Sequence, residues 1–540
     1  MAPSDIFNIS TIENVAAPTT PPPTPDVPDT TLRQVISTRQ FVFMALSSSI
    51  GAGFLVSTSQ ALAVGGPAPL LIAFAVVGFS VWITMCALGE LSTSFPVKGS
   101  FYEFSVRFIS PAWGFAMGWN YVMNFVFVLP FELIVIVMCA RFWNPNLPAE
   151  ELVPACIVGL AFIYAFGARW YAEAENIFGV LKMSAIAVFV VTGLLILCRA
   201  VPTDPRPASE LAYNSWDTSA FKNGGIGFLF VFMSVGVAFG GTEMLGLTAA
   251  ECRSPKRVMR LASVLAAGRI FFLYFVPTLI LGLILKINLD GSGSKALISP
   301  FVMALADARI SVLPDVVNGI IIVSIFSMAN ASIFASSRAL QAISTRGMGP
   351  RFCSLVWRGR PVGALSVVFA FSLLAFAKVS PHGDDVFVWL LALASCSNYL
   401  TWCSICVCHI RLHLAMRRQG RSTYPASYSS ASQSSSDPAS AAAKETGTYR
   451  APLGIAGSAF SVVVFLFGLI AQVVAAVRSL LPSPPAVASS FLGLVVVFVF
   501  WAGYILWKRD WTLIIPLDQI DLGPKEEVDL SLSFTEGGRV

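Results

Sequence analysis

The stretch Ser47-Ser48-Ser49-Ile50-Gly51-Ala52-Gly53-Phe54-Leu55 lies midway along an uncharged apolar run that extends from residue 41 to residue 64. Each of its two glycines weakens a helix interior by about 1 kcal/mol relative to alanine. The neighbouring serines offer the backbone competing hydrogen bonds. In a lipid bilayer, such a break persists only where the released N–H and C=O groups face a cavity or a polar ligand. The stretch therefore predicts a broken membrane helix with a binding site at the break.

A second break of the same kind is predicted at Phe239-Gly240-Gly241-Thr242-Glu243. It lies in the sixth apolar run, five runs after the first break, so the two broken helices should enter the membrane from opposite sides. Inverted five-helix repeats have this arrangement, and their broken first helices meet near the midplane. The exposed helix ends carry partial charges of both signs, and a zwitterion fits that pair of fields.

The composition is that of a membrane protein. Hydrophobic residues make up 56% of the 540 residues and charged residues only 12%, whereas a soluble domain carries about 25% charged residues. Apolar runs of about 20 residues recur along most of the chain, and each is long enough to cross a bilayer as a helix. We therefore expect an all-α polytopic membrane protein and exclude a large soluble core.

About twelve membrane helices are expected, with eleven as the alternative because the fourth run is short. Ten of them form a 5+5 inverted-repeat transporter fold in which helices 1 and 6 are broken, and two extra C-terminal helices follow. The expected spans are 41–64, 69–91, 113–140, 153–168, 177–198, 226–249, 264–285, 314–337, 362–379, 386–408, 454–477 and 488–507. Together they define a membrane domain at 41–508.

The connecting segments predict the orientation. With the N-terminus in the cytosol, the cytosolic loops hold about twice as many Lys and Arg residues as the outer loops, which favours two cytosolic termini. Residues 1–40 are polar and proline-rich and predict a disordered cytosolic tail. Residues 409–453 predict a cytosolic loop with a Ser/Ala-rich insertion, 509–540 a cytosolic C-terminal tail, and 93–112 an amphipathic segment on the inner face.

Metal and nucleic-acid binding are not expected. The spacing Cys403-x-x-Cys406-x-Cys408-His409 resembles a metal-ligand pattern, but it lies at the end of one apolar helix and has no second ligand pair. The ten cysteines lie mostly in apolar runs, where cysteine behaves as a small hydrophobic residue. The net charge is only +5, and the basic residues lie in loops. No cofactor or catalytic residue is predicted, so the chain is not expected to be an enzyme.

A series of motifs occurs in order along the membrane part. They are Ile50-Gly51-Ala52-Gly53-Phe54-Leu55-Val56, Ala63-Val64-Gly65-Gly66-Pro67-Ala68, Ala87-Leu88-Gly89-Glu90-Leu91, Phe95-Pro96-Val97-Lys98-Gly99-Ser100-Phe101, Pro111-Ala112-Trp113-Gly114-Phe115-Ala116-Met117-Gly118-Trp119-Asn120-Tyr121, Phe239-Gly240-Gly241-Thr242-Glu243 and Gly359-Arg360-Pro361. The set closely resembles the amino acid permease family of the amino acid–polyamine–organocation superfamily, and its fungal branch in particular. The resemblance covers about residues 38 to 515. It implies twelve helices, the inverted-repeat fold and uptake of amino acids with protons.

The resemblance implies a substrate site at the first break. Ser49, Ile50, Gly51, Ala52 and Gly53 correspond to the segment whose backbone N–H groups bind the substrate carboxylate. The family places a hydroxyl residue between the two glycines, and this chain has Ala52 there. Either that contact is lost or Ser49 supplies a hydroxyl from one turn away. The alternative is that the two glycines serve close helix packing.

At the second break, the resemblance implies that backbone carbonyls of Phe239, Gly240, Gly241 and Thr242 accept the substrate ammonium, with the Phe239 ring shielding the site. Glu243 lies well inside an apolar span, where an isolated ionised carboxylate costs about 3 kcal/mol or more. It should therefore be paired, protonated or in contact with water. A structural role and a role in substrate or proton binding both remain open for this residue.

Three further polar residues are candidates. Lys182 corresponds to a lysine that proton-coupled relatives place where sodium-coupled relatives bind a cation, and the alternative is that its side chain extends to the membrane surface. Glu132 follows Pro130 deep in the third span and is a candidate for the proton path or for a structural role. Asn330 is expected to link helices beside the substrate path, with direct substrate contact as the less favoured alternative.

The preferred function is a secondary active transporter that imports amino acids across the plasma membrane by proton symport with alternating access. The alternative is a nutrient-sensing receptor of the same fold, favoured only by the long insertion within 409–453. The partners are an amino acid, membrane lipids and, by resemblance to fungal relatives, ubiquitin-dependent trafficking machinery. Because residues 1–97 contain no lysine, a ubiquitin acceptor must lie elsewhere, for example at Lys444 or Lys525.

Overall fold

A computed structural model describes most of the chain. The described residues are 36–95, 101–207, 211–212, 216, 220–250, 255–285, 299–379, 383–421, 449–478 and 484–522. The expected N-terminal tail up to residue 35, the Ser/Ala-rich insertion with Lys444, and the end of the C-terminal tail with Lys525 lie outside these ranges. Within them, the regular elements are helices, and an isolated β-bridge joins Trp357 and Arg360.

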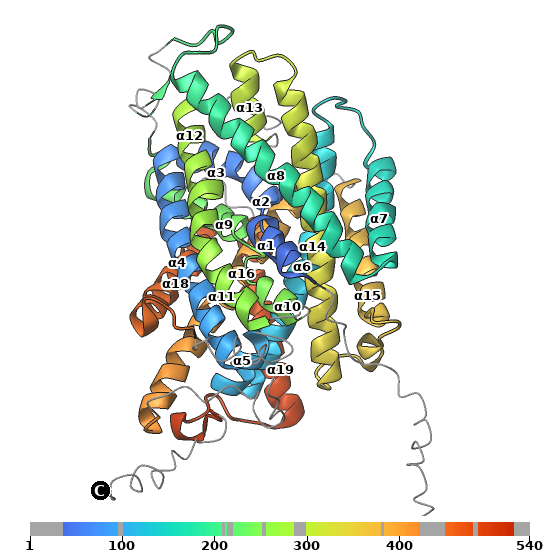
Figure 1. The fold of residues 1–540 in the computed structure, drawn as a ribbon, viewed down its shortest axis with the longest axis vertical. Helices are drawn as coiled ribbons and strands as arrows, with labels where there is room; N and C mark the ends of the chain where they lie inside the picture. Colours follow the sequence, from blue (N-terminus) through green and yellow to red (C-terminus); the bar gives the residue numbers. More distant parts are fainter. Residues whose placement is uncertain are drawn as a thin grey trace, which may run out of the picture.

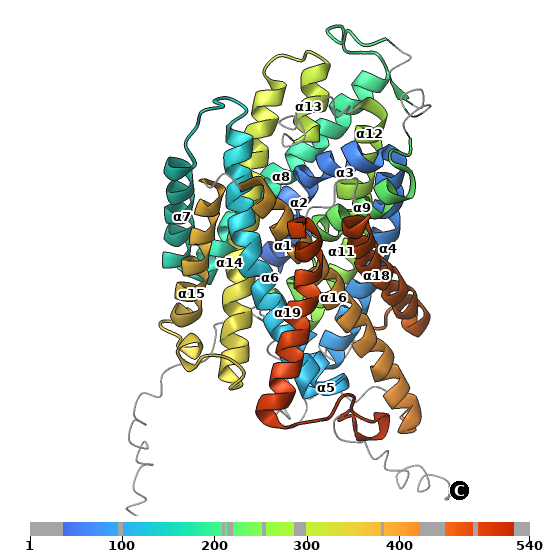
Figure 2. The same cartoon turned by 180° about the vertical axis from the view of Figure 1, so that it is seen from behind.

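The helices run mostly along the long axis of the molecule, and α1, α2 and α9 lie at its centre (Figures 1 and 2). In the first half they are α1 Thr38–Ser47, α2 Ala52–Leu55, α3 Ser57–Gly65, α4 Pro67–Ser94, α5 Phe101–Phe108, α6 Pro111–Ala140, α7 Ala149–Ala165, α8 Ala168–Leu197, α9 Gly224–Ala238 and α10 Leu245–Ala250. In the second half they are α11 Pro255–Arg269, the π-helix η3 Ile270–Phe275, α12 Val276–Ile284, α13 Pro300–Asp307, α14 Leu313–Thr345, η5 Arg351–Ser354, α15 Val362–Ser372, η6 Leu373–Val379, α16 Gly383–Arg418, α18 Gly454–Val477, α19 Pro484–Lys508 and η7 Leu517–Gln519.

The prediction of a polytopic all-α membrane protein is confirmed. Among the described residues, eight helices are long and apolar enough to cross a membrane, and the bent pair Thr38–Leu55 and Ser57–Gly65 raises this number to nine. Two shorter apolar helices, Gly224–Ala238 and Val362–Phe376, lie among them. The total of twelve spans remains a prediction.

Both predicted helix breaks are present. Helix α1 ends at Ser47, α2 begins at Ala52, and the chain bends by 53° between α2 and α3. Helix α9 ends at Ala238 and α10 begins at Leu245. The two broken helices run in opposite directions and lie against each other: Gly65 packs on Gly227, whereas Gly53 packs on Val237. This antiparallel contact brings the two breaks together.

Several helices extend beyond the expected spans. Residues 168–176, expected as a loop, form the first turns of α8, and α16 continues to Arg418 rather than ending near 408. The segment 93–112 contains the short helix α5, and the expected outer loop 286–313 contains α13. Hydropathy marks where apolar residues stop, but a helix continues through charged residues wherever its backbone hydrogen bonds are maintained.

Candidate functional site

A small cavity lies where the two breaks meet. Its centre has room for about one water molecule. The lining comes from the two breaks and from helices α6, α14 and α16, and it consists of Ser49, Gly51, Gly53, Asn124, Phe125, Val128, Glu132, Val237, Gly240, Gly241, Met328 and Asn398. The cavity is thus built from glycine backbone, apolar side chains and a few polar groups, a composition typical of small-molecule sites.

A carboxylate is bound at the first break. The backbone N–H of Ala52, at the start of α2, donates a hydrogen bond to Oε2 of Glu132 over 3.1 Å. Glu132 reaches this position from α6, two residues after Pro130, and its side chain is buried. Helix N-termini favour anions because their N–H groups lack partners within the helix. The geometry therefore shows that this break can hold a carboxylate group.

The two glycines of the first break have different surroundings. A Cβ atom on Gly53 would lie 2.8 Å from the backbone oxygen of Val237, so Gly53 is required for the close contact between α2 and α9. A Cβ atom on Gly51 would lie 2.6 Å from Cγ of Met328 and 2.9 Å from Oε1 of Glu132, beside the cavity. Packing thus accounts for Gly53, whereas the small size of Gly51 keeps space open next to the bound carboxylate.

The remaining residues of the first break face different neighbours. The hydroxyl of Ser49 lines the cavity and shares a hydrogen bond of 2.8 Å with the hydroxyl of Tyr274, in the π-helical segment η3. The Ile50 side chain lines a second, apolar cavity beside Lys182. Ala52 is buried and contributes its N–H group. Ser49 thus places a hydroxyl beside the cavity, and in this structure that hydroxyl is hydrogen-bonded to Tyr274.

An aromatic cluster links the two breaks. The ring of Tyr274 lies 4.7 Å, centroid to centroid, from both Phe54 of the first break and Phe239 of the second. Phe74 of α4 contacts all three rings. Phe239 therefore packs in this cluster next to the cavity and is not part of the lining. π-Helical turns such as η3 occur frequently at functional sites.

The second break is fixed by an arginine that the sequence did not single out. Arg269, the last residue of α11, donates one hydrogen bond of 2.8 Å to the backbone oxygen of Ala45 in α1 and another of 2.8 Å to Oγ1 of Thr242. Thr242 in turn donates to the Phe239 carbonyl over 2.7 Å. Arg269 is 1% exposed. One buried side chain therefore ties both broken helices together.

Replacing Arg269 with methionine is expected to lower the stability of the protein by about 3 kcal/mol or more, because a buried polar network loses its central donor and the Ala45 carbonyl and Thr242 lose their shared partner. Thermal unfolding of the purified protein in detergent measures the effect. Arg269→Lys keeps the charge but not the forked geometry, so its melting temperature should lie between those of the native protein and Arg269→Met. Equal melting temperatures for all three proteins would contradict this role.

Glu243 is buried away from the cavity lining. Its Oε2 accepts a hydrogen bond of 2.9 Å from the indole N–H of Trp402, on α16. The backbone N–H groups of Glu243 and Gly241 also act on this carboxylate, and Arg269 is the nearby cation that acts on it. Glu243 therefore belongs to the network behind the second break, next to the residues that hold the two broken helices.

Lys182 and Asn330 belong to a second polar network on the other side of the first break. The Lys182 ammonium donates a hydrogen bond of 3.2 Å to the carbonyl of Ser47, the last residue of α1. Because Lys182 is only 1% exposed, its side chain does not extend to the membrane surface. The side-chain amide of Asn330, on α14, donates a hydrogen bond of 2.8 Å to the Glu175 carboxylate, and Asn330 does not line the cavity. Glu175 also accepts from Ser327 and lies two turns before Lys182 on α8.

The structure thus separates the candidate residues into three groups. Ser49, Gly51, Gly53, Gly240, Gly241 and Glu132 lie at the cavity. Ala52, Phe239, Thr242 and Glu243 lie directly behind it, and Ile50, Lys182 and Asn330 lie on the side of α8 and α14. The sequence reasoning missed several polar residues at or near the cavity: Asn124, Glu175, Arg269, Tyr274 and Asn398. The signal that could have found them is the same for each, namely a polar residue within or at the edge of an apolar run.

The comparisons with known proteins agree with this architecture. Residues 40–435 match the family model for amino acid permeases. The amino-acid permease GAP3 of Candida albicans is 33% identical over 517 residues, which is 94% of this chain and 82% of the relative. The general amino-acid permease GAP1 of Saccharomyces cerevisiae is 32% identical over 540 residues, covering 97% and 84% of the two chains. The Cationic amino acid transporter 1 of Schizosaccharomyces pombe is 32% identical over 504 residues, covering 91% and 81%.

The chain therefore belongs to the amino acid permease family. It is an integral, multi-pass membrane protein of the transporter class, with a role in amino acid transport, and it is not an enzyme.

Proposed function

We propose that this protein is a secondary active transporter that imports amino acids across the plasma membrane by proton symport and alternating access. The main observation behind the proposal is the hydrogen bond that the Ala52 N–H group donates to the Glu132 carboxylate, at the centre of the molecule. An amino acid brings a carboxylate of the same geometry, so the same N–H group suits the substrate. Other N–H groups of the first break become available to it when the helices separate.

The second break supports binding of the substrate's ammonium group. Helix α9 is 15 residues long and ends at Ala238, next to Gly240 and Gly241 of the cavity lining. The C-terminal end of a helix carries partial negative charge and favours a cation. A zwitterion between the two breaks would therefore have each charged group beside a helix end of opposite sign.

Alternating access is supported by the small size of the cavity. With room for about one water molecule, it cannot hold even a small amino acid unless its walls move. The walls come from different helices, and Met328 of α14 and Val237 of α9 close on the first break from two sides. Relative movement of α14, α9 and the first break would open space for a substrate, as in transporters that move one helix group against another.

Three buried ionisable residues are proposed for the proton pathway: Lys182, Glu132 and Glu243. Lys182 is the strongest candidate, because it contacts the end of α1 and lies in the field of both Glu132 and Glu175. A change in its charge would alter its contact with the broken helix and thereby the position of that helix. The coupling ion is the proton, and no other cofactor is proposed.

Uptake into proteoliposomes tests the proposed function. An inward proton gradient should drive accumulation of at least one of the twenty amino acids, and collapsing the gradient with an ionophore should abolish accumulation. Substrate that binds to a folded protein without gradient-driven uptake would instead identify a receptor. Absence of both binding and uptake for all twenty amino acids would contradict the proposal.

The proposed orientation places both termini in the cytosol, and membrane lipids surround the helix bundle. Ubiquitin-dependent machinery is proposed to control the amount of protein at the plasma membrane. Lysine-to-arginine changes at Lys444 and Lys525, followed by surface labelling during nutrient shifts, would test that control.

A further inference from the structure

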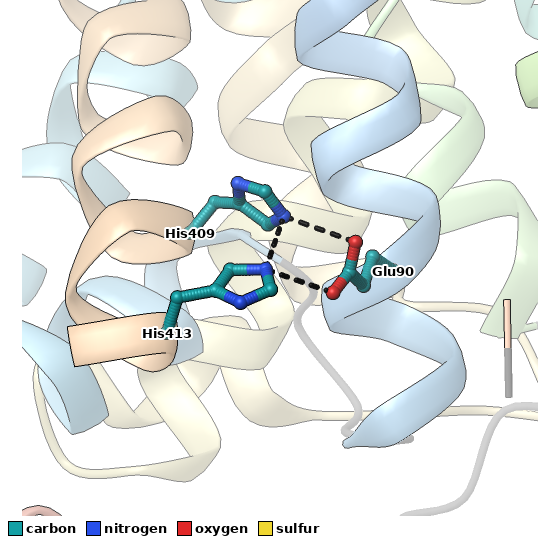
Figure 3. A group of neighbouring side chains, drawn as sticks. All are labelled: Glu90, His409 and His413. Carbon is teal, nitrogen blue, oxygen red and sulfur yellow. Dashed lines mark hydrogen bonds and ion pairs between the residues drawn. The ribbon is translucent and has the colours of Figure 1, made fainter. Parts of the chain in front are cut away.

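A cluster of one carboxylate and two imidazoles lies away from the substrate cavity, between α4 and α16. Figure 3 shows Glu90 of α4 facing His409 and His413, which lie one turn apart on α16. Nε2 of His409 lies 3.1 Å from Oε2 of Glu90, and Nε2 of His413 lies 3.0 Å from Oε1. The two Nε2 atoms are 3.3 Å apart. Two imidazole nitrogens and a carboxylate thus converge on one point.

We propose that Glu90, His409 and His413 form a binding site for a divalent transition-metal ion, with Zn²⁺ as the ion that best suits the ligand set. Zinc binds imidazole nitrogen and carboxylate oxygen at about 2.0–2.2 Å with tetrahedral geometry, which places neighbouring ligand atoms about 3.3 Å apart. The three separations observed here are 3.0, 3.1 and 3.3 Å. Small side-chain adjustments would therefore place a zinc ion between the three groups.

Hydrogen bonds among these three groups bring like partial charges close together when Glu90 is ionised. If both Nε2 atoms carry protons, each can donate to the carboxylate, but the two donors then oppose each other across 3.3 Å. If one Nε2 atom is unprotonated, its lone pair opposes a carboxylate oxygen at 3.0 or 3.1 Å. A divalent cation removes both conflicts, because all three atoms then act as electron-pair donors to the same ion.

The surroundings support the ligand roles. Nδ1 of His409 shares a hydrogen bond of 2.8 Å with Oγ of Ser458, on α18, which fixes the ring and directs Nε2 towards Glu90. Metal-bound histidines commonly have such a partner on their second nitrogen. Oε2 of Glu90 also accepts the backbone N–H of Ala451 over 2.5 Å. Glu90 and His409 are buried, whereas 23% of the His413 side chain is exposed and leaves a path for the ion.

The site would join three separate parts of the chain. Glu90 lies near the end of α4, the histidines near the end of α16, and Ser458 and Ala451 lie in α18 and just before it. A bound ion would therefore hold these helix ends together at the side of the molecule where α5 lies (Figure 2). The proposal is independent of the substrate site, since none of its residues lines the central cavity.

The test is metal binding to the full-length protein, purified in detergent without a polyhistidine tag. After removal of metals with a chelator and addition of Zn²⁺, mass spectrometry of the metal content should find about one zinc ion per chain. The double variant His409→Gln/His413→Gln should lose this ion. In Ser458→Ala, which keeps all three ligands, zinc affinity should fall about tenfold or more. Zinc should also raise the melting temperature of the native protein and not that of the double variant.

Two control variants separate this site from other sources of zinc binding. His382→Gln changes the one histidine of the sequence that is outside the cluster, and Cys403→Ser changes the cysteine-containing pattern on α16. Both variants should retain the zinc ion. If the double variant fails to fold, His413→Gln alone, at the partly exposed position, provides the comparison. A native protein that binds no zinc, or a folded double variant that still binds one ion per chain, would overturn the proposal.

Discussion

Replacing Lys182 with alanine is expected to abolish proton-driven accumulation of amino acids. The substitution removes the ammonium group from the Ser47 carbonyl at the end of α1 and leaves the buried Glu175 and Glu132 without their cation. Breaking a buried charge pair in this way costs about 3–5 kcal/mol. The end of the broken helix would then no longer respond to a change of charge at this position.

Uptake into proteoliposomes with and without a proton gradient measures the effect, and exchange of labelled for unlabelled substrate provides a second readout. Exchange should persist in Lys182→Ala, because it does not require a net proton movement. The double variant Lys182→Ala/Glu175→Gln removes the unpaired carboxylate of Glu175 and should recover stability without recovering accumulation. Normal accumulation in the single variant would assign Lys182 a structural role only.

Replacing Gly51 with alanine is expected to weaken amino acid binding by about 10- to 100-fold. The added Cβ atom would lie 2.6 Å from Met328 and 2.9 Å from the Glu132 carboxylate, in a cavity that is already narrow. Overpacking of this kind costs about 1–3 kcal/mol, and every 1.4 kcal/mol changes an affinity by about a factor of ten. The loss should therefore appear in a binding assay at equilibrium.

A second substitution separates lost space from misfolding. Met328→Gly removes both Cγ and Cβ of residue 328, which the new Cβ would meet at 2.6 and 2.7 Å, so Gly51→Ala/Met328→Gly should bind substrate more tightly than Gly51→Ala alone. Gly503→Ala, on α19, is the matched control, because a Cβ atom there meets nothing within 4 Å. If the double variant binds substrate no more tightly than Gly51→Ala, the substrate does not occupy the cavity next to Gly51.

The sequence predicted the helix breaks because local chemistry causes them. Glycines and serines in an uncharged apolar run weaken a helix wherever they occur, so the position of each break can be derived from the residues nearby. The polytopic class followed from the length of the apolar runs in the same way. The helix ends were less accurate, because α8 and α16 continue through charged residues that hydropathy assigns to loops.

The partners of the polar residues could not be predicted, because they come from distant parts of the chain. Arg269 joins Ala45 to Thr242, and neither contact has a signal in the sequence around Arg269. Glu175 was assigned to a loop, so its position on the same helix as Lys182 was hidden. The cluster at Glu90 was missed because its two histidines lie 319 residues or more from Glu90 along the chain. These contacts depend on the fold as a whole.

The hydrogen bond between Glu132 and the Ala52 N–H group has a consequence for the affinity of any substrate. A carboxylate that is attached to the protein next to its binding group acts as an intramolecular competitor, with an effective concentration in the millimolar range or above. At the proposed site, a free amino acid would have to displace it before its own carboxylate could bind. The affinity of the proposed site would therefore reflect a difference between two carboxylates, and whatever neutralises Glu132 would favour the substrate. In this way a proton that reaches α6 would strengthen amino acid binding without contacting the amino acid.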